Sequence, residues 1–108
     1  MFLRNKKIHL RYNRTEIELD INDVFYIYYE AKTITIVCNN KRYCIYLSMA
    51  EAEYHLDSTP LKKLHKNYII NTEKIKNIIG NKVVLDEYQQ LIPVNQKYLQ
   101  KNYINIYA

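Results

Sequence analysis

The chain has 108 residues, 48% hydrophobic and 25% charged, which is the size and composition of one soluble globular domain with its own core. Its net charge is +5, and the whole excess lies in residues 61–108, where eight Lys and Arg face three Asp and Glu; residues 1–60 carry eight of each. The single glycine excludes glycine-rich phosphate loops, and no apolar run approaches the roughly 20 residues that span a bilayer.

The first 46 residues are predicted to form short strands. Some of these runs alternate apolar and polar residues, as half-buried strands do, whereas residues 24–29 are apolar throughout, as a central strand is. Asn13-Arg14 and Asn39-Asn40-Lys41 predict hairpin turns. The predicted strands are residues 8–12, 15–19, 24–29, 34–38 and 42–46.

A helix is predicted to begin at Ser48. Glu51 follows three residues later, and this spacing predicts a capping box. The segment 57–60, which contains a proline, ends the helix. Its predicted apolar face consists of Met49, Ala52 and Leu56.

Residues 61–71 are the most informative segment of the chain. A cationic and amide-rich run precedes the apolar Tyr68-Ile69-Ile70, which we expect to be a buried strand closed by Asn71. We therefore expect an exposed loop that displays His65, Lys66 and Asn67 at the edge of a rigid strand. Lysine binds phosphate as a point charge, and asparagine can bond base edges, so this loop suits nucleic acid. The alternative is a solvated loop, with Asn71 serving only as a helix or turn cap.

The C-terminal part contains a second predicted hairpin, residues 75–79 and 82–85 around Gly80-Asn81, and a short edge strand at 91–94. Asn95 is expected to cap a last helix. Lys97 lies in its first turn, where a cation opposes the helix macrodipole unless a phosphate docks there. The apolar face of this helix is Tyr98, Leu99, Tyr103 and Ile106.

Together these elements predict a mainly β domain of seven or eight strands and two short helices, and the 12 tyrosines favour strands. A helix-turn-helix motif is excluded because the two predicted helices are separated by about 40 residues of strand pattern. Any DNA contacts would then have to come from loops.

The order of the elements resembles the LytTR-type DNA-binding domain of bacterial transcriptional regulators. The resemblance rests on residues 21–30, 47–53, 64–71 and 92–95, and it runs from about residue 6 to 105. It implies an elongated, mostly antiparallel β-sheet or sandwich fold over residues 1–108, in which loops on one side enter successive major grooves of double-stranded DNA. It also implies that two copies bind repeated sites, whereas the free protein is a monomer.

The resemblance assigns DNA contacts to three places and structural roles to Glu30, Tyr68 and Asn71. The third place often carries arginine in the family, and the amides found here prefer adenine. The family usually attaches this domain to a phosphoacceptor receiver domain, for which this chain has no room, so we expect either an excised domain or a stand-alone regulator. The implied DNA-binding residues are Lys32 and Thr33, then His65, Lys66 and Asn67, then Asn95, Gln96 and Lys97.

The sequence offers no basis for catalysis or a cofactor. Two cysteines and three scattered histidines show no zinc spacing, and no carboxylate pair or activated nucleophile stands out. The start of the chain lacks a signal peptide, so we expect a cytoplasmic protein, in which Cys38 and Cys44 are reduced even though they flank a predicted hairpin.

Two other functions remain open. A β-rich protein-interaction or ligand-sensing module would have an incidental basic face. A single-strand RNA binder would stack bases on exposed tyrosines. The strand positions of most tyrosines favour a role in the core instead.

Overall fold

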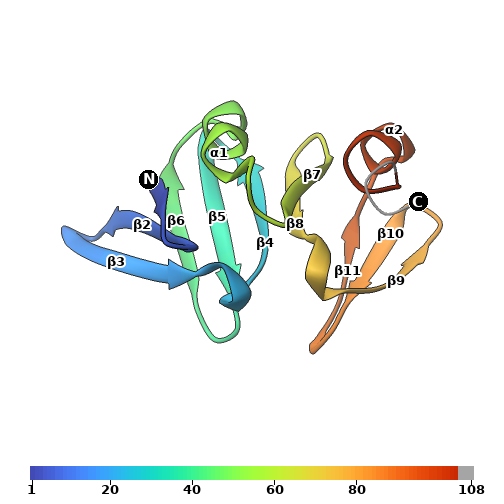
Figure 1. Ribbon diagram of the computed structural model, residues 1–108, viewed down its shortest axis with the longest axis horizontal. Helices are drawn as coiled ribbons and strands as arrows, with labels where there is room; N and C mark the ends of the chain where they lie inside the picture. Colours follow the sequence, from blue (N-terminus) through green and yellow to red (C-terminus); the bar gives the residue numbers. More distant parts are fainter. Residues whose placement is uncertain (105–108) are drawn as a thin grey trace.

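The structure, a computed structural model, describes residues 1–104 and shows three antiparallel sheets side by side (Figure 1). The strand orders are β1-β2-β3, β6-β5-β4-β8-β7 and β11-β10-β9, so the five-stranded sheet lies between the two smaller ones. The domain measures 40 × 29 × 26 Å. This arrangement confirms the predicted mainly β, elongated and antiparallel fold with two short helices.

The strands and helices have the following bounds. The N-terminal sheet contains β1 (Phe2–Arg4), β2 (Lys7–Tyr12) and β3 (Thr15–Asp20). The central sheet contains β4 (Val24–Glu30), β5 (Thr33–Cys38), β6 (Arg42–Tyr46), β7 (Leu61–His65) and β8 (Tyr68–Asn71). The C-terminal sheet contains β9 (Ile75–Ile79), β10 (Lys82–Leu85) and β11 (Tyr88–Pro93). The helices are α1 (Met49–Leu56) and α2 (Gln96–Leu99), the latter continuing as the π-helical turn η3 (Gln100–Ile104), and the 3-10 turns are η1 (Ile21–Asp23) and η2 (Thr72–Lys74).

The predicted hairpins form because their turn residues accept unusual backbone angles. Asn13 and Arg14 have φ angles of 50° and 64°, the left-handed pair that a two-residue hairpin turn requires. Gly80 has a φ of 59°, which glycine adopts without strain, and it joins β9 to β10 as expected.

Helix α1 begins as its sequence predicts. The Glu51 backbone N–H donates to Ser48 Oγ at 3.1 Å, and the Ser48 hydroxyl donates to the Glu51 carboxylate at 3.1 Å. These two bonds confirm the predicted cap. The apolar face is buried at Met49, Ala52 and Leu56, also as predicted.

The central sheet separates two hydrophobic cores. Ile27 and Ile69 belong to the first core, beneath α1 and the N-terminal sheet. Tyr26 and Ile70, their neighbours in sequence, belong to the second core with the C-terminal sheet. Because successive strand residues point to opposite faces, β4 and β8 are covered on both faces, and this is why their sequences are apolar without interruption.

One expectation for residues 61–71 was wrong. Residues 61–65 are not a loop but the strand β7, and only Lys66-Asn67 forms the turn into β8. Leu61 packs in the first core and Leu64 in the second, because residues an odd number apart in a strand point to opposite faces. Each face of β7 thus carries a single buried leucine, so the sequence lacks the period-two pattern by which a strand is recognised.

Other boundaries also differ from the prediction. The strand β1 carried no predicted pattern because it has only three residues. The edge strand β11 begins at Tyr88 rather than at residue 91, although Pro93 does end it as expected. Ile106, expected on the last helix, lies outside the described residues.

The two cysteines are free thiols. Cys44 lies opposite Thr35 on β5, whereas the Cys38 N–H donates to the Lys41 carbonyl, so the two thiols are out of register. Burial, followed by the charge of Asp23, raises the pKa of Cys38 to about 11, which keeps it protonated. Within residues 1–104, no cluster of His, Cys, Asp or Glu is arranged to hold a metal ion, and no helix is long and apolar enough to cross a membrane.

Asn71 is a buried polar tie at the end of β8. Its Nδ2 donates to the carbonyls of Val24 at 2.9 Å and Ile21 at 3.3 Å, and its Oδ1 accepts from the Glu73 N–H at 3.1 Å. The side chain is 1% exposed. Asn71 therefore caps η2, as expected, and also joins β8 to the start of β4.

We expect Asn71→Asp to lower the free energy of unfolding by about 3 kcal/mol, because it removes both donors and buries a carboxylate against two carbonyls. Denaturant titration measures this change. The matched control is Asn81→Asp at the exposed hairpin turn, which should stay within about 0.5 kcal/mol of the wild type. An Asn71 variant as stable as the control would contradict the proposed tie.

Candidate nucleic-acid interface

The three segments predicted to contact DNA lie at one end of the central sheet, where β4 and β7 end and β5 and β8 begin. We call this row of turns the edge. The Tyr29 N–H donates to the Asn67 carbonyl at 2.9 Å, which joins the end of β4 to the turn between β7 and β8. The Asn95 N–H donates to the Leu64 carbonyl at 2.8 Å, which joins the start of α2 to β7. Figure 1 shows the β7–β8 turn and α2 at this same end of the central sheet, at the top of the view.

The first segment is a tight turn at Ala31-Lys32. Their φ angles are 51° and 66°, in the left-handed region that costs a residue with a Cβ about 1 kcal/mol. The Thr33 hydroxyl donates to the Glu30 carbonyl at 2.8 Å and so closes the turn. The turn displays an exposed Lys32 side chain, while the Thr33 oxygen remains available only as an acceptor.

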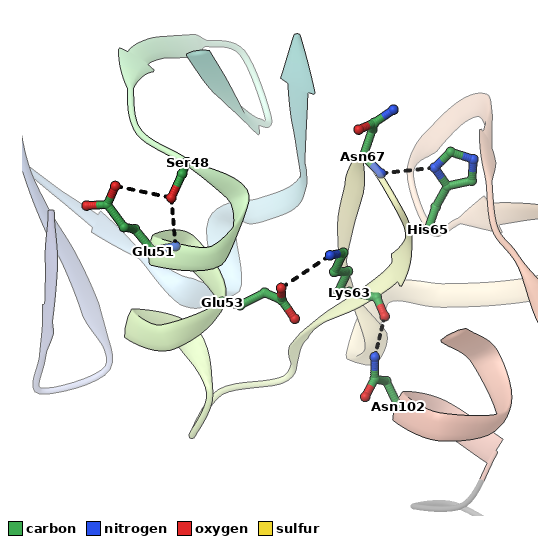
Figure 2. A network of polar contacts seen from close by, with 7 residues as sticks. All are labelled: Ser48, Glu51, Glu53, Lys63, His65, Asn67 and Asn102. Atoms are coloured by element: carbon green, nitrogen blue, oxygen red, sulfur yellow. Dashed lines mark hydrogen bonds and ion pairs between the residues drawn. The ribbon is translucent and has the colours of Figure 1, made fainter. Parts of the chain in front are cut away.

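The second segment is the turn Lys66-Asn67, next to His65. The Asn67 N–H donates to His65 Nδ1 at 3.1 Å, and Figure 2 shows the Asn67 amide pointing away from the hairpin. Burial, followed by the charge of Lys82, lowers the pKa of His65. His65 is therefore neutral near pH 7, and because Nδ1 accepts, its proton lies on Nε2 as a donor.

The third segment is the start of α2. Asn95 Oδ1 accepts from the Lys97 N–H at 2.9 Å, so Asn95 is the predicted helix cap. Its Nδ2 has no hydrogen-bond partner among the described residues. Asn95, Gln96 and Lys97 are all exposed. The cap thus uses one half of the amide and leaves the donor half free.

Two lysines of the cationic run do not belong to this edge. Lys63 forms an ion pair with Glu53 of α1 at 3.3 Å, and its carbonyl accepts from Asn102 Nδ2 at 2.6 Å (Figure 2). Lys62 Nζ donates to the Asp57 carbonyl at 2.8 Å. Both cations therefore hold elements of the fold together.

The edge itself is cationic. Lys32, Lys66 and Lys97 are exposed, and none of them forms an ion pair within residues 1–104. Three unpaired ammonium groups in one row suit a polyanion. The acidic exception is Glu30, whose side chain is exposed.

The three residues expected to be structural differ in outcome. Asn71 is buried and bonded as described above, and the Tyr68 ring packs against Tyr26, Tyr28 and His65. The Glu30 carboxylate makes no hydrogen bond or ion pair within the described part of the chain, so a structural role for its side chain is not supported. Exposed acidic residues beside turns are common, so the sequence could not indicate that the Glu30 side chain lacks a bonding partner.

Comparison with known proteins bears on the domain as a whole. A model of the LytTr DNA-binding domain family matches residues 14–102. The solved LytTr DNA-binding domain of a Bacillus cereus protein described as a methyl-accepting/DNA response regulator is similar in structure, with a TM-score of 0.71 and 22% sequence identity. The alignment covers 91% of this chain and 94% of that one, and it shows a shared fold. A search of curated proteins found no match.

The lowered pKa of His65, caused by burial and then by the charge of Lys82, predicts a pH dependence. Because the folded-state pKa of His65 lies below the usual 6.5, the unfolded chain binds a proton first as the pH falls through 6.5, and the free energy of unfolding decreases. Denaturant titrations at about pH 7.5 and about pH 5.5 should show a smaller loss for His65→Asn, which has no titrating group, than for the wild type. Equal losses in the two proteins would contradict this assignment.

Proposed function

This chain belongs to the LytTr DNA-binding domain family, and from this premise we propose that it recognises a specific double-stranded DNA sequence and regulates transcription. The observation that carries the proposal is the pair of backbone bonds, Tyr29 to Asn67 and Asn95 to Leu64. They bring three segments that are distant in sequence onto one exposed, cationic edge. DNA binding is the activity for which the matched family is named.

Two kinds of contact are proposed along the edge. Lys32, Lys66 and Lys97 bind phosphates, which position the protein without reading sequence. The free amides of Asn67 and Asn95 and the Nε2–H of His65 are directed at base edges, with Thr33 and Gln96 beside them. The amide donors favour purine acceptors, and an Asn bidentate to adenine is the geometry to test first.

The size of the domain supports contact with more than one groove. Its long dimension is 40 Å, and one helical repeat of B-DNA is about 34 Å. A domain lying along the duplex can therefore reach successive major grooves. We propose that two copies bind side by side on repeated sites and that the free protein is a monomer.

The RNA-binding alternative finds little support in the tyrosines. The rings of Tyr26, Tyr28 and Tyr68 pack against one another at centroid distances of 6.1–6.2 Å. Within the described part of the chain, only Tyr46 and Tyr54 are largely exposed tyrosines, and two separated rings do not make a stacking platform. The interaction-module alternative makes no use of the three unpaired lysines.

Selection from a library of random duplexes tests the proposal. A sequence-specific regulator should enrich one repeated motif, and sedimentation of the free protein should show a monomer. An unenriched pool, or equal affinity for all duplexes, would contradict the proposal and favour the protein-interaction or ligand-sensing module instead.

We expect Lys66→Ala and Lys97→Ala each to weaken binding to all duplexes about equally and to reduce the log–log salt slope by about 1, because each removes one phosphate contact. Titrations at several salt concentrations measure the slope. Lys41→Ala, in the exposed β5–β6 turn at the opposite end of those strands, is the control and should leave the slope unchanged. A change in base preference at one position would mean that the lysine reads sequence instead.

Asn95→Asp separates the capping role of Asn95 from its proposed DNA contact. Aspartate accepts the Lys97 N–H as well as asparagine does, so thermal stability should hardly change. Aspartate has an oxygen in place of the Asn95 Nδ2, so it cannot donate to a base, and it brings a negative charge toward the phosphates. Specific binding should therefore weaken by about 1–3 kcal/mol. Asn67→Asp should behave in the same way. Unchanged specific affinity in both variants, measured on the selected duplex, would remove these two residues from the interface.

A further inference from the structure

Tyr46 lies at the end of the same row of turns, beside the Ala31-Lys32 turn. It is the last residue of β6, the edge strand of the central sheet, and it lies opposite Thr33 in the β5–β6 register. Thr33 directly follows Lys32, so the tyrosine is next to the first turn of the candidate interface. The row of exposed side chains therefore extends by one strand beyond the three predicted segments.

The face from which Tyr46 projects follows from its neighbours. The alternate residues Tyr43 and Ile45 pack into the first core. Arg42, four residues before Tyr46 and on the same side of the strand, donates to the Tyr88 hydroxyl of β11 at 3.3 Å. Tyr46 thus projects from the face that carries the C-terminal sheet, which leads into α2 and Asn95.

The C-terminal sheet does not reach Tyr46. Its second core covers β4 and β8, through residues such as Tyr26 and Ile70, but not the end of β6. Tyr46 is 85% exposed and makes no hydrogen bond or ring contact with the rest of the described chain. The side chain therefore contributes nothing to either core.

We propose that Tyr46 is a further DNA contact, whose hydroxyl donates to a backbone phosphate at the flank of the groove that the turns enter. This inference rests on the proposed function. A phenol is rigid, and tyrosine hydroxyls are among the usual donors to phosphate. Lys32 beside it attracts the same strand of phosphates.

The neutral phenol gives the contact a distinct signature. Binding a phosphate through an uncharged donor releases no counterion, so loss of Tyr46 lowers affinity without changing the salt slope. Loss of Lys32 lowers both. The contact should be largely independent of sequence, so a duplex of mixed sequence is a sufficient probe.

The absence of tryptophan from the chain provides a direct test. Tyr46→Trp places a single fluorophore at the proposed contact, and Tyr54→Trp is the matched control, since Tyr54 on α1 is 80% exposed and outside the proposed contacts. A mixed-sequence duplex of two helical turns is added at low salt, and binding is followed independently by the anisotropy of labelled DNA. We expect DNA to change the tryptophan emission of the Tyr46→Trp variant, and the midpoint of this change should equal the midpoint of the anisotropy titration. The emission of the Tyr54→Trp variant should stay unchanged.

Affinities complete the test. Tyr46→Phe and Tyr46→Ala should bind about threefold to tenfold more weakly than wild type, as loss of one hydrogen bond predicts, with unaltered salt slopes. Wild-type affinity in both variants, with unchanged emission at position 46, would overturn the inference while the proposed function stands. Wild-type affinity in Tyr46→Phe alone would overturn the hydroxyl contact. Failure of the wild type to bind any duplex would overturn both proposals.

Discussion

The antiparallel pairing of β4 with β8 is the contact on which the rest of the structure depends. Tyr26, Ile27 and Tyr28 lie opposite Ile70, Ile69 and Tyr68. The pairing joins the two halves of the chain and forms the wall between the two cores, because alternate residues of both strands point to opposite faces. It also places the Ala31-Lys32 turn beside the Lys66-Asn67 turn, since the end of one antiparallel strand meets the start of the other. Without this pairing the two turns would not lie on a common edge.

The position of the third segment depends on a hydrogen-bonded network between the sheets. The Tyr88 hydroxyl accepts from Arg42 at 3.3 Å, lies 3.1 Å from the Tyr26 hydroxyl and donates to Gln90 at 3.0 Å. Burial, followed by the bond to Tyr88, raises the pKa of Tyr26 far above its usual value, so the phenol stays a neutral donor. The network fixes β11 against the central sheet, and β11 leads directly to Asn95. An internal polar network thus orients the exposed start of α2.

The basic charge of the chain serves two purposes that composition cannot distinguish. Lys63 is bound to Glu53 of α1, and Lys62 is bound to Asp57, which directly follows α1. The Lys63 ammonium also lies 5.4 Å from the centre of the Tyr98 ring. These cations tie α1 and α2 to β7 and leave less charge for a partner. Lys66, in the turn of the same hairpin, has no ion pair within the described chain and is exposed. The net charge alone therefore does not tell which cations are free, and Lys32, Lys66 and Lys97 on the one edge are exposed and without an ion pair in the described chain.

The sequence by itself determined most of the local structure, because alternation, capping and turn preferences act over a few residues. The caps at Ser48 and Asn95 were predictable, as were the Asn13-Arg14 turn and the uninterrupted apolar run of a central strand. Strand β7 was not, since it contributes one leucine to each core and therefore lacks the alternation that marks a strand. Only the tertiary structure decided which polar side chains are free. That depends on partners such as Glu53, which reach β7 only after residues distant in sequence have paired and packed.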